Sequence, residues 1–256
     1  MHRLRALACS AVVAFACGVA GPQAALPTVA PGTGAPYVAV LVWHDVVDRK
    51  DVWFDTTTAD LRAQLDRIAR GGYHVVSLAA LRDRLKTGKP LPPKPLVLTF
   101  DDNAIGIYRN AYPLLRSHRF AATLFVHTNF VGKTTSKIHA SWAQLREMER
   151  GGAIDVQSLT ANHPPDLTKL SDADVRHELT LSKFSLERRL GRGVFALAYP
   201  YDVYDPRVER LAAQSGYTLG FTEDAGNAAA SNSLLEIHRY SALARFDQAL
   251  ADVAAR

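Results

Sequence analysis

Short apolar runs alternate with amphipathic segments from Tyr37 to the end of the chain. The apolar runs are rich in β-branched and aromatic residues, so each predicts a β-strand. The predicted strands lie at 38–43, 73–78, 96–100, 122–127, 153–158, 194–199, 217–221 and 234–240. Most of the intervening segments have apolar residues at helical spacing, which predicts helices. These helices lie at 58–70, 78–87, 105–117, 142–150, 172–190, 206–214 and 244–254.

Strands that are separated by helices predict a parallel sheet with the helices packed against it. An open doubly wound sheet and a closed (β/α) barrel both have this pattern. Polar residues favour the barrel, because they follow the carboxyl ends of different strands and a barrel brings those ends to one rim. These residues are His44, Asp101, Asp102, His127, the segment 158–163, the segment 199–201 and His238. We therefore predict a single α/β domain, a barrel of seven or eight β–α units.

The beginning of the chain predicts an export signal. Two early arginines precede an apolar run that ends near Ala20, and small residues follow it. This is the layout of a secretory signal peptide, and the run is shorter than the ~20 residues of a membrane-spanning helix. We predict a signal peptide at 1–25, a Pro- and Gly-rich linker at 26–36 and the barrel at 37–256. The protein is then exported, periplasmic or secreted, with no stable membrane span after cleavage.

The positions of the cysteines and the net charge limit the metal ligands and the partners that are possible. Cys9 and Cys17 both lie in the predicted signal peptide, so the mature chain has no thiolate ligand and no disulfide. Any metal must be held by His, Asp or Glu. The formal net charge of +5 includes the arginines of the signal, and no basic run with interleaved aromatics appears, so nucleic acid is not an expected partner. The pattern does not define an oligomeric state.

Two adjacent carboxylates, Asp101 and Asp102, end a predicted strand in the stretch LTFDDN. Capping of the following helix by Asp102 or Asn103 is the simpler interpretation. Capping accounts for one acid, however, and not for two directly after a buried strand. Adjacent side chains point to different sides, so one acid is able to hold a metal while the other takes a proton. The pair therefore predicts a catalytic centre.

Several separate stretches resemble the polysaccharide deacetylases with a NodB homology domain. They are WHDV (43–46), VLTFDD (97–102), SWAQLREM (141–148), IDVQSLTANHPPDLTKLS (154–171) and AYPYD (198–202). The order and spacing of the motifs are similar over nearly all of 37–221. The resemblance implies a distorted β/α barrel. It also implies a hydrolase that uses a divalent metal, often zinc, to remove acetyl groups from N-acetylated sugars in polymers.

Carried onto this chain, the resemblance implies that Asp101 is the general base and that Asp102 and His163 are metal ligands. It also implies that the backbone N–H of Tyr201 helps to hold the oxyanion. An amide needs this help because its carbonyl is a poor electrophile: a metal polarises it, a carboxylate takes a proton from water, and a backbone donor stabilises the tetrahedral intermediate. We assign protonation of the leaving amine to His238, in the last predicted strand.

The metal site departs from the pattern that the resemblance implies. The family has two metal-binding histidines four positions apart, and Leu159 takes the place of the first of them. Leucine has no lone pair to donate, whereas catalytic zinc sites normally have three protein ligands. His127 is a candidate substitute ligand, although a buried, hydrogen-bonded histidine at a strand end is the simpler interpretation. His44 is expected to line the site.

Three further positions differ from the family pattern. Asn103 and Asp202 stand where the family usually has glycine, and Ala198 stands where many members have an arginine near the base. A negative charge at Asp202, next to the implied oxyanion donor, would oppose an oxyanion unless its side chain points away. The catalytic machinery is recognisable but altered.

Three functions fit these residues to different degrees. The first is an exported, metal-dependent hydrolase that removes N-acetyl groups from an aminosugar polysaccharide. The alternative is a catalytically impaired or inactive homologue that binds glycan, and Leu159 motivates it. In both, the partner is an N-acetylated polysaccharide or oligosaccharide. A glycoside hydrolase fits least well, because its two acids face each other across ~5 Å or more, and the neighbours Asp101 and Asp102 are poorly placed for that.

Overall fold

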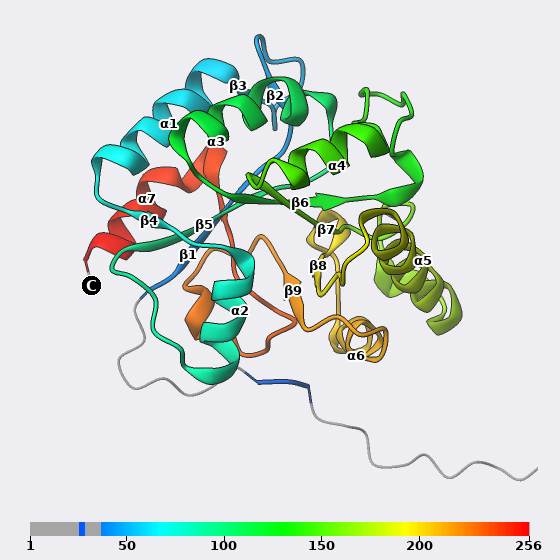
Figure 1. The fold of residues 1–256 in the computed structure, drawn as a ribbon. Helices are drawn as coiled ribbons and strands as arrows, with labels where there is room; N and C mark the ends of the chain where they lie inside the picture. The colour runs from blue at the N-terminus through cyan, green and yellow to red at the C-terminus, as the bar shows by residue number, and fades with distance from the viewer. Residues whose placement is uncertain (1–25, 29–36, 256) are drawn as a thin grey trace, which may run out of the picture.

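The computed structural model describes residues 26–28 and 37–255 (Figure 1). The predicted signal peptide at 1–25 and most of the predicted linker lie outside the described residues. Within the described residues, no helix is long and apolar enough to cross a membrane.

One parallel sheet organises the described chain (Figure 1). Its strands are β1 (Ala39–Trp43), β4 (His74–Val75), β5 (Pro95–Phe100), β6 (Ala122–Val126), β7 (Ile154–Ser158), β8 (Ala196–Ala198), β9 (Leu219–Phe221) and β10 (Tyr240–Ser241). The order is β10-β1-β5-β6-β7-β8-β9, with β4 also paired to β5. All of these strands are parallel to their neighbours. Their carboxyl ends therefore lie along the same edge.

The sheet curls into a half-barrel. Ile237 makes a single parallel bridge to Phe221 at the end of β9, and shortly afterwards β10 pairs with β1, with Tyr240 opposite Leu41. This segment thus connects the two edges of the sheet. The predicted α/β barrel fold is confirmed in this distorted form. The predicted strand at 234–240 was wrong over most of its length, because a turn in which the Glu236 N–H donates to the Ser233 carbonyl interrupts it.

Helices pack around this sheet and lie close to their predicted positions. They are α1 (Thr58–Arg70), α2 (Leu78–Thr87), α3 (Tyr112–His118), α4 (Trp142–Arg150), α5 (Asp172–Leu190), α6 (Pro206–Gln214) and α7 (Ala242–Ala254). Hydroxyl side chains at the N-caps define several of the starts. Ser77, Ser141 and Ser171 each accept a hydrogen bond from a backbone N–H in the first turn of α2, α4 and α5.

Alternate residues of the strands face two apolar clusters. Leu41 in β1 belongs to the larger cluster, which lies between the sheet and the surrounding helices. Val40, its neighbour, belongs to a second cluster inside the curl of the sheet, and Leu78 and Leu81 of α2 complete that interior. The inner cluster is the floor on which the carboxyl-end residues rest.

A small ribbon, which the sequence pattern did not predict, stands next to the main sheet. Its strands β2 (Val46–Val47) and β3 (Thr56–Thr57) are parallel and short. The loop between them carries Trp53 and Phe54 to the carboxyl edge of the sheet, where both line a cavity.

Candidate active site

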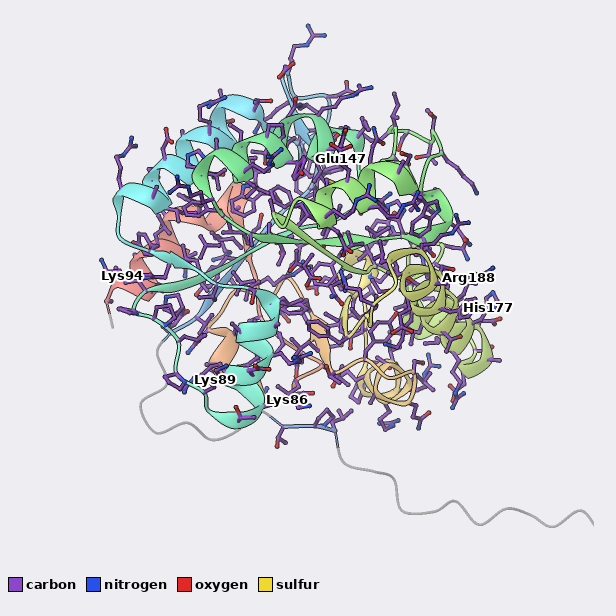
Figure 2. All side chains as sticks on the ribbon, in the orientation of Figure 1. Lys86, Lys89, Lys94, Glu147, His177 and Arg188 are labelled. Carbon is purple, nitrogen blue, oxygen red and sulfur yellow. The ribbon has the colours of Figure 1, made fainter. Side chains whose placement is uncertain are left out.

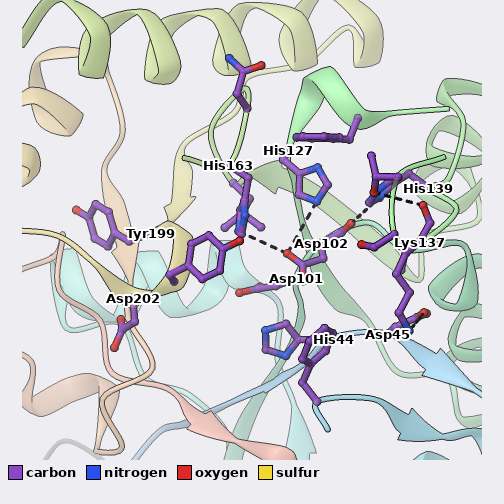
Figure 3. A pocket seen from close by; sticks show the side chains of 18 of the residues that line it. His44, Asp45, Asp101, Asp102, His127, Lys137, His139, His163, Tyr199 and Asp202 are labelled. Carbon is purple, nitrogen blue, oxygen red and sulfur yellow. Dashed lines mark hydrogen bonds and ion pairs between the residues drawn. The ribbon is translucent and has the colours of Figure 1, made fainter. Parts of the chain in front are cut away.

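A cavity of about 570 Å³ opens at the carboxyl ends of the strands. It brings together most of the side chains that the sequence singled out, from five separate segments of the chain (Figure 3). Those that line it are His44, Asp101, Asp102, His127, Leu159, His163, Tyr201 and Asp202. The expectation that these residues converge on one rim agrees with this arrangement.

Asp101 is held by a buried arginine that the sequence analysis missed. Both carboxylate oxygens of Asp101 accept hydrogen bonds from the guanidinium of Arg239, at 2.9 Å each. Arg239 is 1% exposed, and its Nε donates to the carbonyl of Thr222. Burial alone would lower the pKa of Arg239, but the Asp101 carboxylate outweighs burial and raises it. Asp101 is therefore fixed in orientation by a permanent positive charge.

Asp102 has a different environment from its neighbour. Its Oδ1 lies 3.6 Å from Nε2 of His163 and 3.9 Å from Nε2 of His127. Figure 3 shows both imidazoles directed at this carboxylate. The two adjacent acids thus have separate partners, a guanidinium for Asp101 and two imidazoles for Asp102. The two acids therefore differ in environment, as the prediction of separate roles requires.

Burial keeps the two imidazoles neutral. The pKa of His127 is lowered to about 3, chiefly by burial and in addition by the neighbouring His163 and His139. Burial also lowers the pKa of His163, although the carboxylates of Asp102 and Asp101 oppose that change. Neutral imidazole is the form with a free lone pair, which is the form that binds metals.

His139 lies beside His127 but has other partners. Its Nδ1 lies 3.2 Å from the backbone carbonyl of Asp102, and its Nε2 lies 2.9 Å from the hydroxyl of Thr135. Both ring nitrogens are thus engaged in hydrogen bonds. His139 supports the turn that carries Asp102 and is not free to bind a ligand.

Asn103 and Asp202, which stand where the family usually has glycine, both have a left-handed backbone conformation. Asn103 has φ 41° and Asp202 has φ 59°. Glycine is the usual residue there, and Asn and Asp are the other residues that tolerate this region best. Asn103 also accepts a hydrogen bond from the backbone N–H of His127 at 3.3 Å. The substitution therefore keeps the turn and adds a contact to the next strand.

Asp202 points away from the centre of the site. Its Oδ1 accepts a hydrogen bond from the backbone N–H of Glu223 at 2.8 Å, and Figure 3 shows its side chain directed away from Asp102. Burial raises its pKa to about 6. Tyr201, just before it, has φ 53°, and its ring lies 4.7 Å from that of His163.

Leu159 and His163 lie on one loop, which α5 holds in place. Glu178 of α5 accepts hydrogen bonds from the backbone N–H groups of Ala161 and Asn162, at 3.1 and 2.8 Å. Leu159 is 1% exposed and belongs to the apolar cluster inside the sheet. It closes the floor of the cavity at the position where the resemblance implied an imidazole.

His44 lies on the other side of Asp101 from the two imidazoles (Figure 3). Its Nε2 is 3.6 Å from Oε1 of Glu223. Among the described residues, His44, Asp101 and Glu223 form a group whose possible ligand atoms all lie within 4.8 Å of one another. Because both oxygens of Asp101 are bound by Arg239, this group suits proton transfer better than cation binding.

The structure does not bring His238 to the other site residues. It is half-buried, lies outside the cavity lining, and packs beside Gly226, where an added Cβ would lie 2.3 Å from its Nδ1. His74, His118 and His177 also lie outside the cavity lining. Figure 2 shows His177 on the outer face of α5, where it is exposed.

The rim of the cavity carries exposed aromatic side chains. Trp53 is 82% exposed, and its ring meets that of Phe54 edge-on at 5.5 Å. Asp55, next along the chain, is fully buried and anchors this loop by accepting hydrogen bonds from the Asp51 and Val52 N–H groups and from Lys137 Nζ. The fold therefore holds a large apolar ring in solvent at the mouth of the cavity.

Comparisons with known proteins agree with this geometry. The sequence model of the family described as polysaccharide deacetylase matches residues 88–220. The chain is 26% identical to the Bacillus subtilis protein YxkH over 200 residues, which cover 78% of this chain and 69% of that protein. The structure resembles that of the Streptococcus pyogenes deacetylase PplD in complex with acetate, with a TM-score of 0.75 and 28% identity. That match covers 81% of this chain and 93% of PplD.

A further relative has a named substrate. The Escherichia coli poly-β-1,6-N-acetyl-D-glucosamine N-deacetylase is 31% identical over 134 residues, which cover 47% of this chain. The matched region is only 20% of the Escherichia coli protein.

Proposed function

Because this chain belongs to the polysaccharide deacetylase family, we propose that it is a metal-dependent hydrolase that removes N-acetyl groups from an aminosugar polysaccharide. One observation carries the proposal: the adjacent acids Asp101 and Asp102 lie in one cavity with different partners, a buried guanidinium and two neutral imidazoles. Hydrolysis of an amide needs a base and an electrophilic centre close together, and this pair is able to supply both.

In this proposal the chain's own residues orient the amide and move protons. Asp101, oriented by Arg239, takes a proton from the attacking water. The backbone N–H of Tyr201 donates to the oxygen that becomes negative in the tetrahedral intermediate. Asp202 does not oppose this charge strongly, because its carboxylate is turned toward the Glu223 N–H.

The leaving amine needs a proton from an acid, and two histidines compete for this role. We assign it to His44 in place of our sequence-based choice, His238. His44 lines the cavity beside Asp101, with Glu223 close to its Nε2. Glu223 is thus placed to orient the His44 ring, from which the amine would take its proton.

The donors around Asp102 fit a divalent cation, and zinc is our first candidate. Carboxylate oxygen and neutral imidazole nitrogen are donors that zinc prefers. Asp102 and His163 would hold the ion, and it would polarise the amide carbonyl and lower the pKa of water. The resemblance to enzymes that act on N-acetylated sugars and the exposed Trp53 at the cavity mouth support a glycan substrate. Export, which rests on the signal-peptide prediction, would give access to a polymer outside the cytoplasm.

The alternative, a homologue that binds glycan without hydrolysing it, has one observation in its favour. Leu159 is buried and apolar at the position where the resemblance to the family implies a metal-binding histidine. Binding of oligosaccharide that is indifferent to chelators, together with no release of acetate, would favour this alternative.

Release of acetate from a β-1,6-linked N-acetylglucosamine oligomer tests the proposed function. We expect turnover in the wild type, loss of it after treatment with a chelator, and a loss of at least about 100-fold in Asp101→Asn, since general base catalysis contributes about 10²–10⁴-fold. Asp202→Asn is the matched control, because it changes a carboxylate in the same cavity that faces away, and it should keep most of the activity.

Asp101→Asn also breaks a buried ion pair, which on its own costs several kcal/mol. Circular dichroism at the assay temperature must therefore show a folded variant. Full activity in folded Asp101→Asn would exclude Asp101 as the base. Absence of acetate release from the wild type with added metal would exclude the deacetylase proposal itself.

A further inference from the structure

We propose that His127 is the third protein ligand of the metal, together with Asp102 and His163, in place of an imidazole at position 159. This inference rests on the proposed metal-dependent function. It identifies the residue that compensates for Leu159 and so explains how an active site with a missing histidine remains complete.

The first argument is the convergence of two imidazoles on one oxygen. Oδ1 of Asp102 lies 3.6 Å from Nε2 of His163 and 3.9 Å from Nε2 of His127. In a tetrahedral site with bonds of about 2.0–2.1 Å, the donor atoms lie roughly 3.3–3.4 Å apart. Both distances are thus within about half an ångström of those in a metal site. The imidazole centroids are 5.3 Å apart, with the rings inclined at 52°. Among the described residues, Asp102, His127 and His163 do not have all their ligand atoms within 4.8 Å of one another, so the two imidazoles must move closer together when the ion binds.

The second argument concerns the hydrogen bonds of these groups. Within the described residues, the side-chain contacts of the Asp102 carboxylate are these two imidazoles, at distances too long for hydrogen bonds. Nδ1 of His127 is buried and has no hydrogen-bond partner there. A buried polar group without a partner costs free energy. The simpler interpretation, a strand-end histidine with both ring nitrogens hydrogen-bonded, therefore does not describe His127.

The third argument is the fixed position of His127. It follows β6, its backbone N–H donates to Asn103 Oδ1, and its ring packs edge-on against Phe130 at 4.7 Å. His139 is the other imidazole in contact with it, at 4.9 Å, and its nitrogens are already hydrogen-bonded. A ligand held on a strand end by packing is better ordered than one on a free loop.

A second substitution in the same site shows the same kind of compensation. Ala198 stands where many relatives have an arginine near the base, and here Arg239 from the other end of the sheet binds Asp101 in its place. The cavity has thus regained one charged group from the segment just before β10. His127, directly after β6, replaces the imidazole of position 159 in the same way.

Cobalt binding tests the inference without relying on turnover. The metal-stripped protein is titrated with Co²⁺, and calorimetry and the visible absorption of the bound ion are recorded. We expect one site in the wild type and an affinity lower by about 100-fold or more in His127→Val, because losing even an outer partner of a ligand costs about 10–100-fold. Leu159→His in the His127→Val background should restore most of the affinity, since it returns a third donor to the site.

His177→Gln is the matched control, because it removes an exposed imidazole on the outer face of α5, away from the cavity; its affinity should stay within about threefold of the wild type. Thermal melting without metal shows whether each variant is folded. Unchanged Co²⁺ affinity in folded His127→Val, or no binding by the wild type at near-millimolar Co²⁺, would overturn the inference. If acetate is released while His127→Val binds Co²⁺ normally, the ligand assignment fails and the proposed function stands. If Co²⁺ binding needs His127 but no acetate is released, the ligand assignment stands and the proposed function fails.

Discussion

The pair of Asp101 and Arg239 shows how a site residue acquires its role from a distant part of the sequence. Arg239 is buried, and its guanidinium meets both oxygens of Asp101. A buried charge is tolerated only when it is paired and hydrogen-bonded. The acid therefore has one orientation, with its remaining lone pairs directed to the cavity. Such orientation is what a general base needs before substrate arrives.

Comparison of His44 with His238 tests the assignment of the acid. We expect His44→Asn to lower kcat for acetate release by about 10²-fold or more, because general acid catalysis contributes about 10²–10⁴-fold. His238→Asn, the matched control, should change kcat by less than about threefold, since His238 lies outside the cavity lining. Steady-state kinetics over pH 5–9 measures both. A large loss in His238→Asn with normal kinetics in His44→Asn would reverse the assignment.

Site residues were predictable where they stand in local motifs. Asp101, Asp102, His163 and Tyr201 follow strand ends in recognisable stretches, and the structure gathers all four in one cavity. Arg239 and Glu178 gave no such signal. One is an arginine next to a histidine in an irregular segment, and the other is a glutamate among the charges of α5. Their roles depend on pairing across the fold, which spacing along the chain does not encode.

At the scale of elements, the boundaries of helices followed from local chemistry. The bounds of α1, α2, α4, α5 and α6 are those expected from the sequence, because polar N-caps and glycines near the ends fix them. The ribbon of β2 and β3 was not expected. Each strand has only two residues, which is too short for a period-2 pattern to emerge.

The loop between β2 and β3 supplies the aromatic rim of the cavity. Trp53 in this loop is 82% exposed, although large aromatic residues are more often buried. The loop is not free, because Lys137 Nζ lies 3.0 Å from Asp45 Oδ2 and 2.6 Å from Asp55 Oδ1. These ion pairs hold the loop, and with it Trp53, in a fixed position, which lowers the entropic cost of binding a sugar ring.

Trp53→Ala should weaken the binding of long substrates only. A sugar ring that covers about 40 Å² of the indole contributes about 1 kcal/mol at about 25 cal/mol per Å², so KM for a pentameric substrate should rise about fivefold with little change in kcat. Hydrolysis of 4-nitrophenyl acetate, which is too small to reach from the catalytic acids to the rim, serves as the internal control. Trp53→Phe should keep most of the affinity. An unchanged KM for the pentamer in Trp53→Ala would rule out the stacking role.

At the scale of the whole molecule, the half-barrel explains why chemistry gathers at one edge. All neighbouring strands of the main sheet are parallel, so every strand end contributes to the same rim. The alternation of strands and helices predicted this much. The closure of the curl was not predictable, because it depends on one bridge at Ile237 and on the short β10. Neither has a distinctive hydrophobic period.

Away from the cavity, the buried carboxylate of Glu209 in α6 has an energetic cost. Glu209 is 4% exposed, and its Oε2 has no hydrogen-bond partner within the described residues. Burial, assisted by the charge of Glu236, raises its pKa from 4.5 to about 6. Between these values the folded state holds a proton that the unfolded state has lost. The free energy of unfolding therefore falls as pH rises through about 4.5–6 and stays lower above that range.

Glu209→Gln should consequently raise the free energy of unfolding at pH 7.5 by about 1–2 kcal/mol, since one pKa unit corresponds to about 1.4 kcal/mol. It should also flatten part of the decline between pH 4.5 and 6. A part will remain, because the pKa of Asp202 is raised to about 6 as well. Urea unfolding at pH 5 and 7.5 measures both effects.

Glu187→Gln in α5 is the control of opposite sign. Burial acts to raise the pKa of Glu187, but hydrogen bonds from the Val194 N–H and Lys183 outweigh it, and the pKa is lowered. An ionised Glu187 thus stabilises the fold above its ordinary pKa, and the amide should reduce stability at pH 7.5. If Glu209→Gln also reduced stability at that pH, the buried carboxylate would have to be making a favourable interaction as an anion, and the energetic cost assigned to it would be wrong.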